Sequence, residues 1–132
     1  MNEQPHVLVA DDKSEMRGLI ASVLRKDGYQ VDEASDGFEL LAVIESLVGH
    51  TAGRRPPIGM IISDVRMPGL TGLDLLAILR CADWTTPVIL ITAFGDDETH
   101  AQAHELGATA VFDKPFEMEE LRAAVRNAVP PW

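Results

Sequence analysis

Short runs of apolar residues alternate along this chain with longer segments in which apolar residues recur every three or four positions. Five apolar runs predict strands over residues 7–10, 29–34, 58–62, 88–91 and 110–112. The segment after each run predicts a helix, most clearly where Met16, Leu19, Ile20, Val23 and Leu24 fall on one helical face. Strict alternation of strands and helices predicts an α/β fold with a parallel sheet covered on both faces.

The other predicted helices vary in how clearly they are marked. The expected core positions of the second, third and fifth helices are Phe38, Leu41, Ile44, Leu47 and Val48, then Leu73, Leu76 and Leu79, then Leu121 and Val125. The fourth helix, over 96–107, carries a single leucine and is the weakest prediction. Gly28 and Gly107 are expected to end helices, and Asp36, Thr71 and Asp96 to cap helix N-termini.

Polarity also predicts the order of the strands. The first, third and fourth runs are almost wholly apolar, whereas 29–34 is polar and 110–112 is short. Polar or short strands suit the edges of a sheet, which gives the doubly wound (βα)5 order 2-1-3-4-5. Right-handed crossovers then place helices one and five on one face and helices two, three and four on the other. We expect one domain over 1–132, with its core from about 5 to 129.

Composition limits the classes of function. The chain has 132 residues with 46% hydrophobic and 24% charged residues, which is typical of one globular domain. No apolar run approaches the roughly 20 residues of a bilayer span, so no membrane partner is expected. The formal net charge of −10 disfavours direct nucleic-acid binding. Cys81 is the only cysteine, and with no secretory signal at the N-terminus we expect a reducing cytoplasm.

Charged and hydroxyl side chains follow four of the predicted strands. Asp11 and Asp12 follow the first strand, Asp64 the third, Thr92 the fourth and Lys114 the fifth. The carboxyl ends of parallel strands share one edge of the sheet, where ligands bind in open α/β folds. Three carboxylates near one lysine favour a hard divalent cation such as Mg²⁺. An ionised aspartate can also attack phosphorus without a base.

Each of these residues also has an ordinary structural interpretation. Asp11 or Asp12 could cap the first helix, Asp64 could open a turn, Thr92 could end a strand and Lys114 could be a solvated charge. The spacing does not identify which carboxylate is the nucleophile. The pattern is informative because all five residues are expected at the same edge.

Four stretches of the chain, residues 7–12, 64–72, 89–93 and 114–116, carry motifs in a characteristic order. They resemble the receiver domain of two-component response regulators, the CheY-like family, over essentially the whole chain. The resemblance implies that Asp64 accepts a phosphoryl group from the phosphohistidine of a sensor histidine kinase or phosphotransfer protein. It also implies that Asp12, Asp64 and the backbone carbonyl of Arg66 ligate Mg²⁺, and that Asp11 acts mainly through a metal-bound water.

The resemblance extends to the signalling step. Lys114 would pair with the phosphoryl oxygens, and the Lys114-Pro115 bond is expected to be cis. Thr92 would turn toward the phosphate and change the surface of helix four, strand five and helix five for an output protein or an attached output domain. The family often has an aromatic residue three positions before the lysine. Here that position is Val111, and Phe112 points to the opposite side of the strand.

Other functions compete with this interpretation. A Mg²⁺-dependent phosphohydrolase of the haloacid-dehalogenase type would need an Asp-x-Asp pattern after the first strand, which Asp11-Asp12-Lys13 does not match. A receiver used only as an interaction module is disfavoured because all five site residues are present. The chain could also be the receiver piece of a larger hybrid kinase or DNA-binding regulator.

His100 and His104 have the spacing of a metal-binding pair without an evident third ligand. The loop over 50–57 is expected to be a solvated connection, and the alternative is a docking arm.

Overall fold

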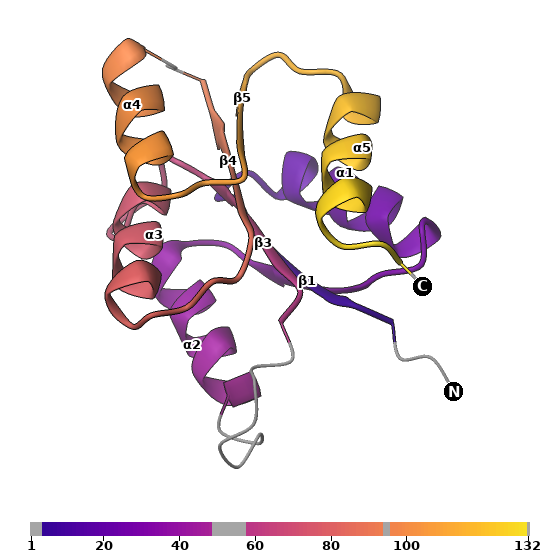
Figure 1. Cartoon of the computed structure of the whole chain (residues 1–132). Helices are drawn as coiled ribbons and strands as arrows, with labels where there is room; N and C mark the ends of the chain where they lie inside the picture. The colour runs from indigo at the N-terminus through magenta and orange to yellow at the C-terminus, as the bar shows by residue number, and fades with distance from the viewer. Residues whose placement is uncertain (1–3, 49–57, 94–95, 132) are drawn as a thin grey trace.

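The computed structural model describes residues 4–48, 58–93 and 96–131 (Figure 1). Its five strands and five helices alternate without exception, as the hydrophobic pattern predicts. In chain order they are β1 (His6–Ala10), α1 (Ser14–Lys26), β2 (Gln30–Ala34), α2 (Gly37–Val48), β3 (Met60–Asp64), α3 (Gly72–Cys81), β4 (Val88–Thr92), α4 (Asp97–Glu105), β5 (Ala110–Asp113) and α5 (Met118–Ala128). The predicted loop over 50–57 lies outside the described residues.

The strands form one parallel sheet in the order β2-β1-β3-β4-β5, which confirms the predicted topology. Figure 1 shows α1 and α5 on one face of this sheet and α2, α3 and α4 on the other. The polar strand β2 and the short strand β5 occupy the two edges. No helix in the described part of the chain is long and apolar enough to cross a membrane.

Two hydrophobic clusters hold the helices against the sheet. Successive side chains of β1 point to opposite faces, so Val7 and Val9 pack with α1 and α5 while Leu8 packs with α2 and α3. The interior strands β3 and β4 are buried along their whole length. Each large aliphatic side chain buried in this way contributes about 1.5–3 kcal/mol to folding.

Two of the expected core positions are wrong. Leu19 is 52% exposed and Phe38 is 63% exposed. In α2 the buried positions are Leu40 and Ile44, which turns Phe38 away from the sheet. The Phe38 ring instead covers Gly69 in the loop after β3, where an added Cβ would collide with it. The buried face at the start of α2 is therefore one position out of phase with the face that includes Phe38.

The predicted helix ends are confirmed. Gly28 and Gly107 adopt positive φ angles of 105° and 80°, which a residue with a Cβ rarely adopts. Thr71 forms a reciprocal capping box at the start of α3, and Asp96 accepts a backbone hydrogen bond at the start of α4. Asp36 accepts a bond of 2.7 Å from the Glu39 N–H in the first turn of α2.

Candidate functional site

The predicted site residues lie at the carboxyl edge of the sheet. Asp11 directly follows β1, Asp64 and Thr92 end β3 and β4, and Lys114 directly follows β5. The ladder continues past the strands, because the Lys114 N–H donates to the Thr92 carbonyl at 2.8 Å. The backbone therefore delivers these side chains to one edge before any side chain interacts.

Three carboxylates gather there. One oxygen from each of Asp11, Asp12 and Asp64 lies within 4.8 Å of the others. Asp11 and Asp64 are 1% and 5% exposed, whereas Asp12 is exposed. The Lys114 Nζ lies 3.3 Å from Oδ2 of Asp64 and 3.8 Å from Oδ2 of Asp11. One ammonium therefore faces three carboxylates, and the cluster carries excess negative charge.

The Asp11 side chain does not cap α1. Its Oδ1 accepts the Lys13 N–H at 2.9 Å, while Lys13 itself is the N-cap residue of α1. Its buried Oδ2 has no hydrogen-bond partner among the described residues. Burial raises the pKa of Asp11, and the nearby Asp64 carboxylate raises it further. The capping interpretation of Asp11 is therefore wrong, and one of its oxygens is available to a cation.

Asp64 is fixed on both oxygens. Oδ1 accepts the Arg66 N–H at 3.3 Å, and Oδ2 accepts from Lys114. Close packing constrains its backbone as well, because a Cβ added to Gly72 would lie 2.6 Å from the Asp64 carbonyl oxygen. The first residue of α3 thus packs directly against the end of β3, and only glycine fits there without a shift.

The donor set fits a hard divalent cation. All three side chains offer oxygen, the ligand that Mg²⁺ prefers, and none offers nitrogen or sulfur. Two carboxylates about 4 Å apart repel each other by about 4 kcal/mol at an effective dielectric near 20. The buried Oδ2 of Asp11, which has no hydrogen-bond partner among the described residues, adds a second cost that a bound cation would remove. These residues fit Mg²⁺.

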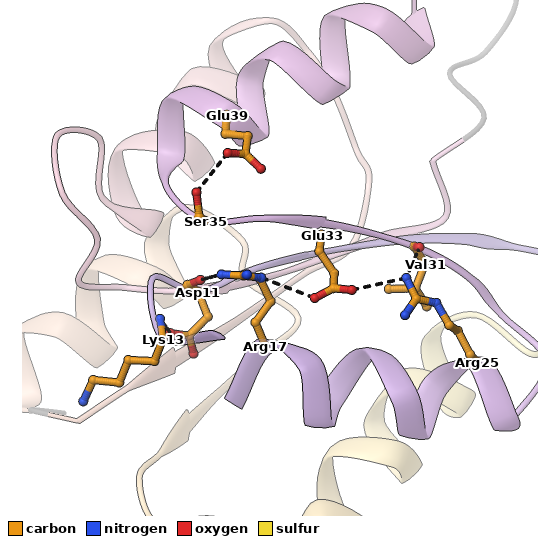
Figure 2. A network of polar contacts seen from close by, with 8 residues as sticks. All are labelled: Asp11, Lys13, Arg17, Arg25, Val31, Glu33, Ser35 and Glu39. Atoms are coloured by element: carbon orange, nitrogen blue, oxygen red, sulfur yellow. Dashed lines mark hydrogen bonds and ion pairs between the residues drawn. The ribbon is translucent and has the colours of Figure 1, made fainter. Parts of the chain in front are cut away.

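One residue that contacts the site, Arg17, is not marked by the sequence pattern. Arg17 of α1 donates from Nη1 to the backbone carbonyl of Asp11 at 2.8 Å (Figure 2). Its Nε donates to Glu33 of β2 at 3.3 Å. The only sequence signal is an arginine one turn into the helix that follows the aspartate pair. Amphipathic helices commonly carry arginines on their polar face, so this signal does not single out Arg17.

Several finer expectations are also resolved. The Lys114-Pro115 peptide bond is cis, as expected. Val111 packs with the α2, α3 and α4 side of the sheet and Phe112 with the α1 and α5 side. His100 makes a 2.9 Å contact with Asp113. Within the described residues, the aspartate cluster is the one group of three potential ligands, so the histidine pair gains no third ligand.

Comparison with known proteins agrees with this geometry. A family model described as "Response regulator receiver domain" matches residues 7–126. The sporulation initiation phosphotransferase F of Bacillus subtilis is 32% identical, over 98% of this chain and 96% of that protein. The transcriptional regulatory protein FixJ of Bradyrhizobium diazoefficiens is also 32% identical, but the chain spans only 58% of its length.

Solved structures give the same result. The chemotaxis protein CheY4 of Vibrio cholerae superimposes with a TM-score of 0.80 at 29% identity, covering 96% of this chain and all of CheY4. The receiver domain of the Francisella response regulator 1452 has a TM-score of 0.80 at 31% identity, covering 94% and 95% of the two chains. The chain belongs to the receiver domain family of two-component response regulators and serves as a phosphoacceptor signalling module.

Proposed function

We propose that Asp64 is the residue that accepts the phosphoryl group. The observation that carries this proposal is the arrangement of Asp11, Asp12 and Asp64 around a common point with Lys114 beside Asp64. Of the two carboxylates that pair with the Lys114 ammonium, Asp64 lies nearer, at 3.3 Å compared with 3.8 Å for Asp11. It also ends a central strand, which gives the acceptor a rigid support.

In the proposed transfer, an oxygen of Asp64 forms a bond to phosphorus. The bond between phosphorus and the imidazole nitrogen of a donor phosphohistidine breaks, and the imidazole leaves with the electron pair and takes a proton. An ionised carboxylate needs no general base for this attack. Lys114 neutralises charge on the transferring group, and the Thr92 hydroxyl donates to a phosphoryl oxygen.

Asp11, Asp12, Asp64 and the backbone carbonyl of Arg66 are proposed to hold Mg²⁺. When bound, the ion supplies positive charge that stabilises the phosphoryl oxygens during transfer. Asp12 and Asp64 would bind it directly, and the buried Oδ2 of Asp11 would act mainly through a water on the metal. This assignment is supported because that oxygen has no hydrogen-bond partner among the described residues.

Signalling is proposed to pass from Thr92 to the surface of α4, β5 and α5. Thr92 is buried at the end of β4, next to Asp113 in the register of β5. A shift of its hydroxyl toward the phosphate would change the surface that an output protein or attached output domain contacts. The donor would be a sensor histidine kinase or a phosphotransfer protein.

We propose that residues 1–132 act as one receiver domain in the cytoplasm, either alone or joined to an output segment. A relative of each kind supports these two possibilities. The chain spans 96% of the sporulation initiation phosphotransferase F, but only 58% of FixJ. Its chemistry is proposed to be limited to its own phosphorylation and dephosphorylation, without turnover of an external substrate.

Intact-mass spectrometry tests the acceptor. With Mg²⁺ and acetyl phosphate, the wild-type chain should gain the mass of one phosphoryl group, and the Asp64→Asn variant should gain none. Equal labelling of both proteins would contradict the assignment of Asp64. Sustained release of phosphate from a monoester such as p-nitrophenyl phosphate would instead favour a phosphohydrolase.

A further inference from the structure

Arg17 connects the acidic site to the edge of the sheet. Its guanidinium donates through Nη1 to the Asp11 carbonyl at 2.8 Å and through Nε to Glu33 Oε1 at 3.3 Å. Figure 2 shows the side chain crossing from α1 to β2 between these two acceptors. The Arg17 side chain is only 19% exposed, so these bonds are largely shielded from water.

The protein fixes every polar group of Asp11 except one. The Asp11 N–H donates to the Ala34 carbonyl at 3.1 Å, and Oδ1 accepts from Lys13. Arg17 donates a hydrogen bond to the backbone carbonyl of Asp11. What is left is Oδ2, the buried oxygen near Asp64 and Lys114. The orientation of that oxygen therefore depends on how firmly the Asp11 peptide group is held.

A second arginine provides a natural comparison. Arg25, two turns further along α1, donates from Nη2 to the other oxygen of Glu33 at 3.3 Å. Its other acceptor is the Val31 carbonyl at 2.8 Å, on the edge strand and away from Asp11. Arg17 and Arg25 thus share a carboxylate, a helix and a charge, and differ in which backbone carbonyl they hold.

We propose that Arg17 is a positioning residue for the metal site. It holds the peptide that joins Asp11 to Asp12, and Glu33 in turn holds the guanidinium in the orientation that this bond requires. Mg²⁺ binding, and through it phosphorylation, then depends on a residue that contacts neither the metal nor the phosphoryl group. The inference rests on the proposed function for the identity of the metal.

Charge and positioning make opposite predictions for Arg17. A cation beside a metal site repels Mg²⁺, so loss of its charge alone would tighten binding. Loss of a group that holds a ligand residue weakens binding, commonly by about 10- to 100-fold. Lysine keeps the charge but cannot reproduce the fork with which arginine bonds two acceptors. Arg17→Lys therefore isolates the positioning effect.

The experiment compares Arg17→Lys with Arg25→Lys in the full chain. Mg²⁺ dissociation constants are measured from amide chemical shifts at constant ionic strength. Arg17→Lys should weaken Mg²⁺ binding about tenfold, and Arg25→Lys by less than about twofold. Wild-type affinity in Arg17→Lys, or equal weakening in both variants, would overturn the proposal.

A second measurement does not use the metal. In Mg²⁺-free protein, amide hydrogen exchange at Asp12 and Lys13 should be several-fold faster in Arg17→Lys than in wild type or Arg25→Lys. Unchanged exchange there would also overturn the proposal. If wild-type protein bound no Mg²⁺, the proposed metal would fail, while the exchange rates would still decide the role of Arg17.

Discussion

The Nζ of Lys114 lies 3.3 Å from Oδ2 of Asp64 and 3.8 Å from Oδ2 of Asp11, so one ammonium serves two buried carboxylates. Asp64 receives a hydrogen bond from it, whereas Asp11 Oδ2 has no such partner in the described part of the chain. Without a further cation, the carboxylates of this site repel one another at the carboxyl edge of the sheet.

Asp11→Asn should stabilise the metal-free protein. An amide keeps the bond from the Lys13 N–H, and its NH₂ can donate to Asp64 where the buried oxygen now has no donor. We expect the free energy of unfolding to rise by about 1–2 kcal/mol, measured by urea denaturation at pH 7. Mg²⁺ should raise the unfolding midpoint of this variant less than that of wild type.

Asp12→Asn is the matched control, because Asp12 is exposed. It should change metal-free stability by no more than about 0.5 kcal/mol. A fall in stability for Asp11→Asn would show that the ionised carboxylate is already well compensated.

Lys114→Met should have the opposite effect on stability. The variant leaves Asp11 and Asp64 without their shared cation, and the lysine side chain is only 18% exposed. We expect a loss of about 1–3 kcal/mol without metal, much of it recovered in excess Mg²⁺. Urea denaturation with and without Mg²⁺ measures the loss and its recovery. The control is Lys26→Met, which replaces an exposed lysine at the end of α1. A loss that Mg²⁺ leaves unchanged would argue against a shared site.

Much of the fold follows from the sequence because buried strands and amphipathic helices leave strong periodic signals. The order β2-β1-β3-β4-β5 was predictable since the polarity of β2 marks it as an edge. Phe38 was misplaced because its exposure depends on tertiary contact with Gly69, which periodicity does not encode. The local phase of a short helix is decided by its neighbours.

The site was predictable for a different reason. Parallel strands bring their carboxyl ends to one edge whatever lies between them, so Asp11, Asp64 and Lys114 could be grouped from strand position alone. The contact of Arg17 with a backbone carbonyl could not be predicted in the same way. This contact depends on the path of the turn after β1. The direction in which a backbone carbonyl points cannot be predicted from the residue types around it.

Thr92→Ala should separate phosphorylation from signalling. The proposed acceptor and metal ligands are intact in this variant, so acetyl phosphate should still label it, although more slowly because one donor to a phosphoryl oxygen is missing. Amide shifts of α4 and β5 on adding beryllofluoride should be much smaller than in wild type, because the buried hydroxyl no longer links the site to that surface. Thr85→Ala, at an exposed threonine before β4, is the control. A full wild-type response in Thr92→Ala would exclude this route.

Acid should weaken the contact between α1 and α5. Arg122 donates to both oxygens of Asp27, at 2.8 and 2.6 Å, across 95 residues of sequence. These bonds lower the pKa of Asp27 below its ordinary value. The unfolded chain therefore takes up this proton first as the pH falls, and the contribution of Asp27 to stability is complete above the ordinary pKa and lost between it and the lowered one.

Asp27→Asn should reduce the dependence of the free energy of unfolding on pH in that acidic window. Arg122→Met should reduce it similarly, and the double variant should show no further reduction because both changes remove the same interaction. Urea denaturation between pH 2.5 and 7 measures this. Unchanged slopes in both single variants would contradict the role assigned to the pair.

Gly72→Ala should damage the site through the backbone. The new Cβ would lie 2.6 Å from the Asp64 carbonyl oxygen and 3.1 Å from Ser63 Oγ, so α3 and the end of β3 would have to separate. We expect a loss of about 1–3 kcal/mol in stability, typical of overpacking. Labelling of Asp64 by acetyl phosphate should slow by about 10- to 100-fold, because a displacement of about 1 Å is costly in a positioned site.

Gly18→Ala supplies the contrast, since a Cβ at Gly18 in α1 would meet no atom within 4 Å. That change should stabilise the protein by about 0.5–1 kcal/mol through helix propensity and leave labelling unchanged. Intact-mass time courses and urea denaturation on both variants measure the pair of effects. Wild-type labelling by Gly72→Ala would mean that Asp64 tolerates movement of its own backbone, so that the rigidity of β3 would not be what prepares the acceptor.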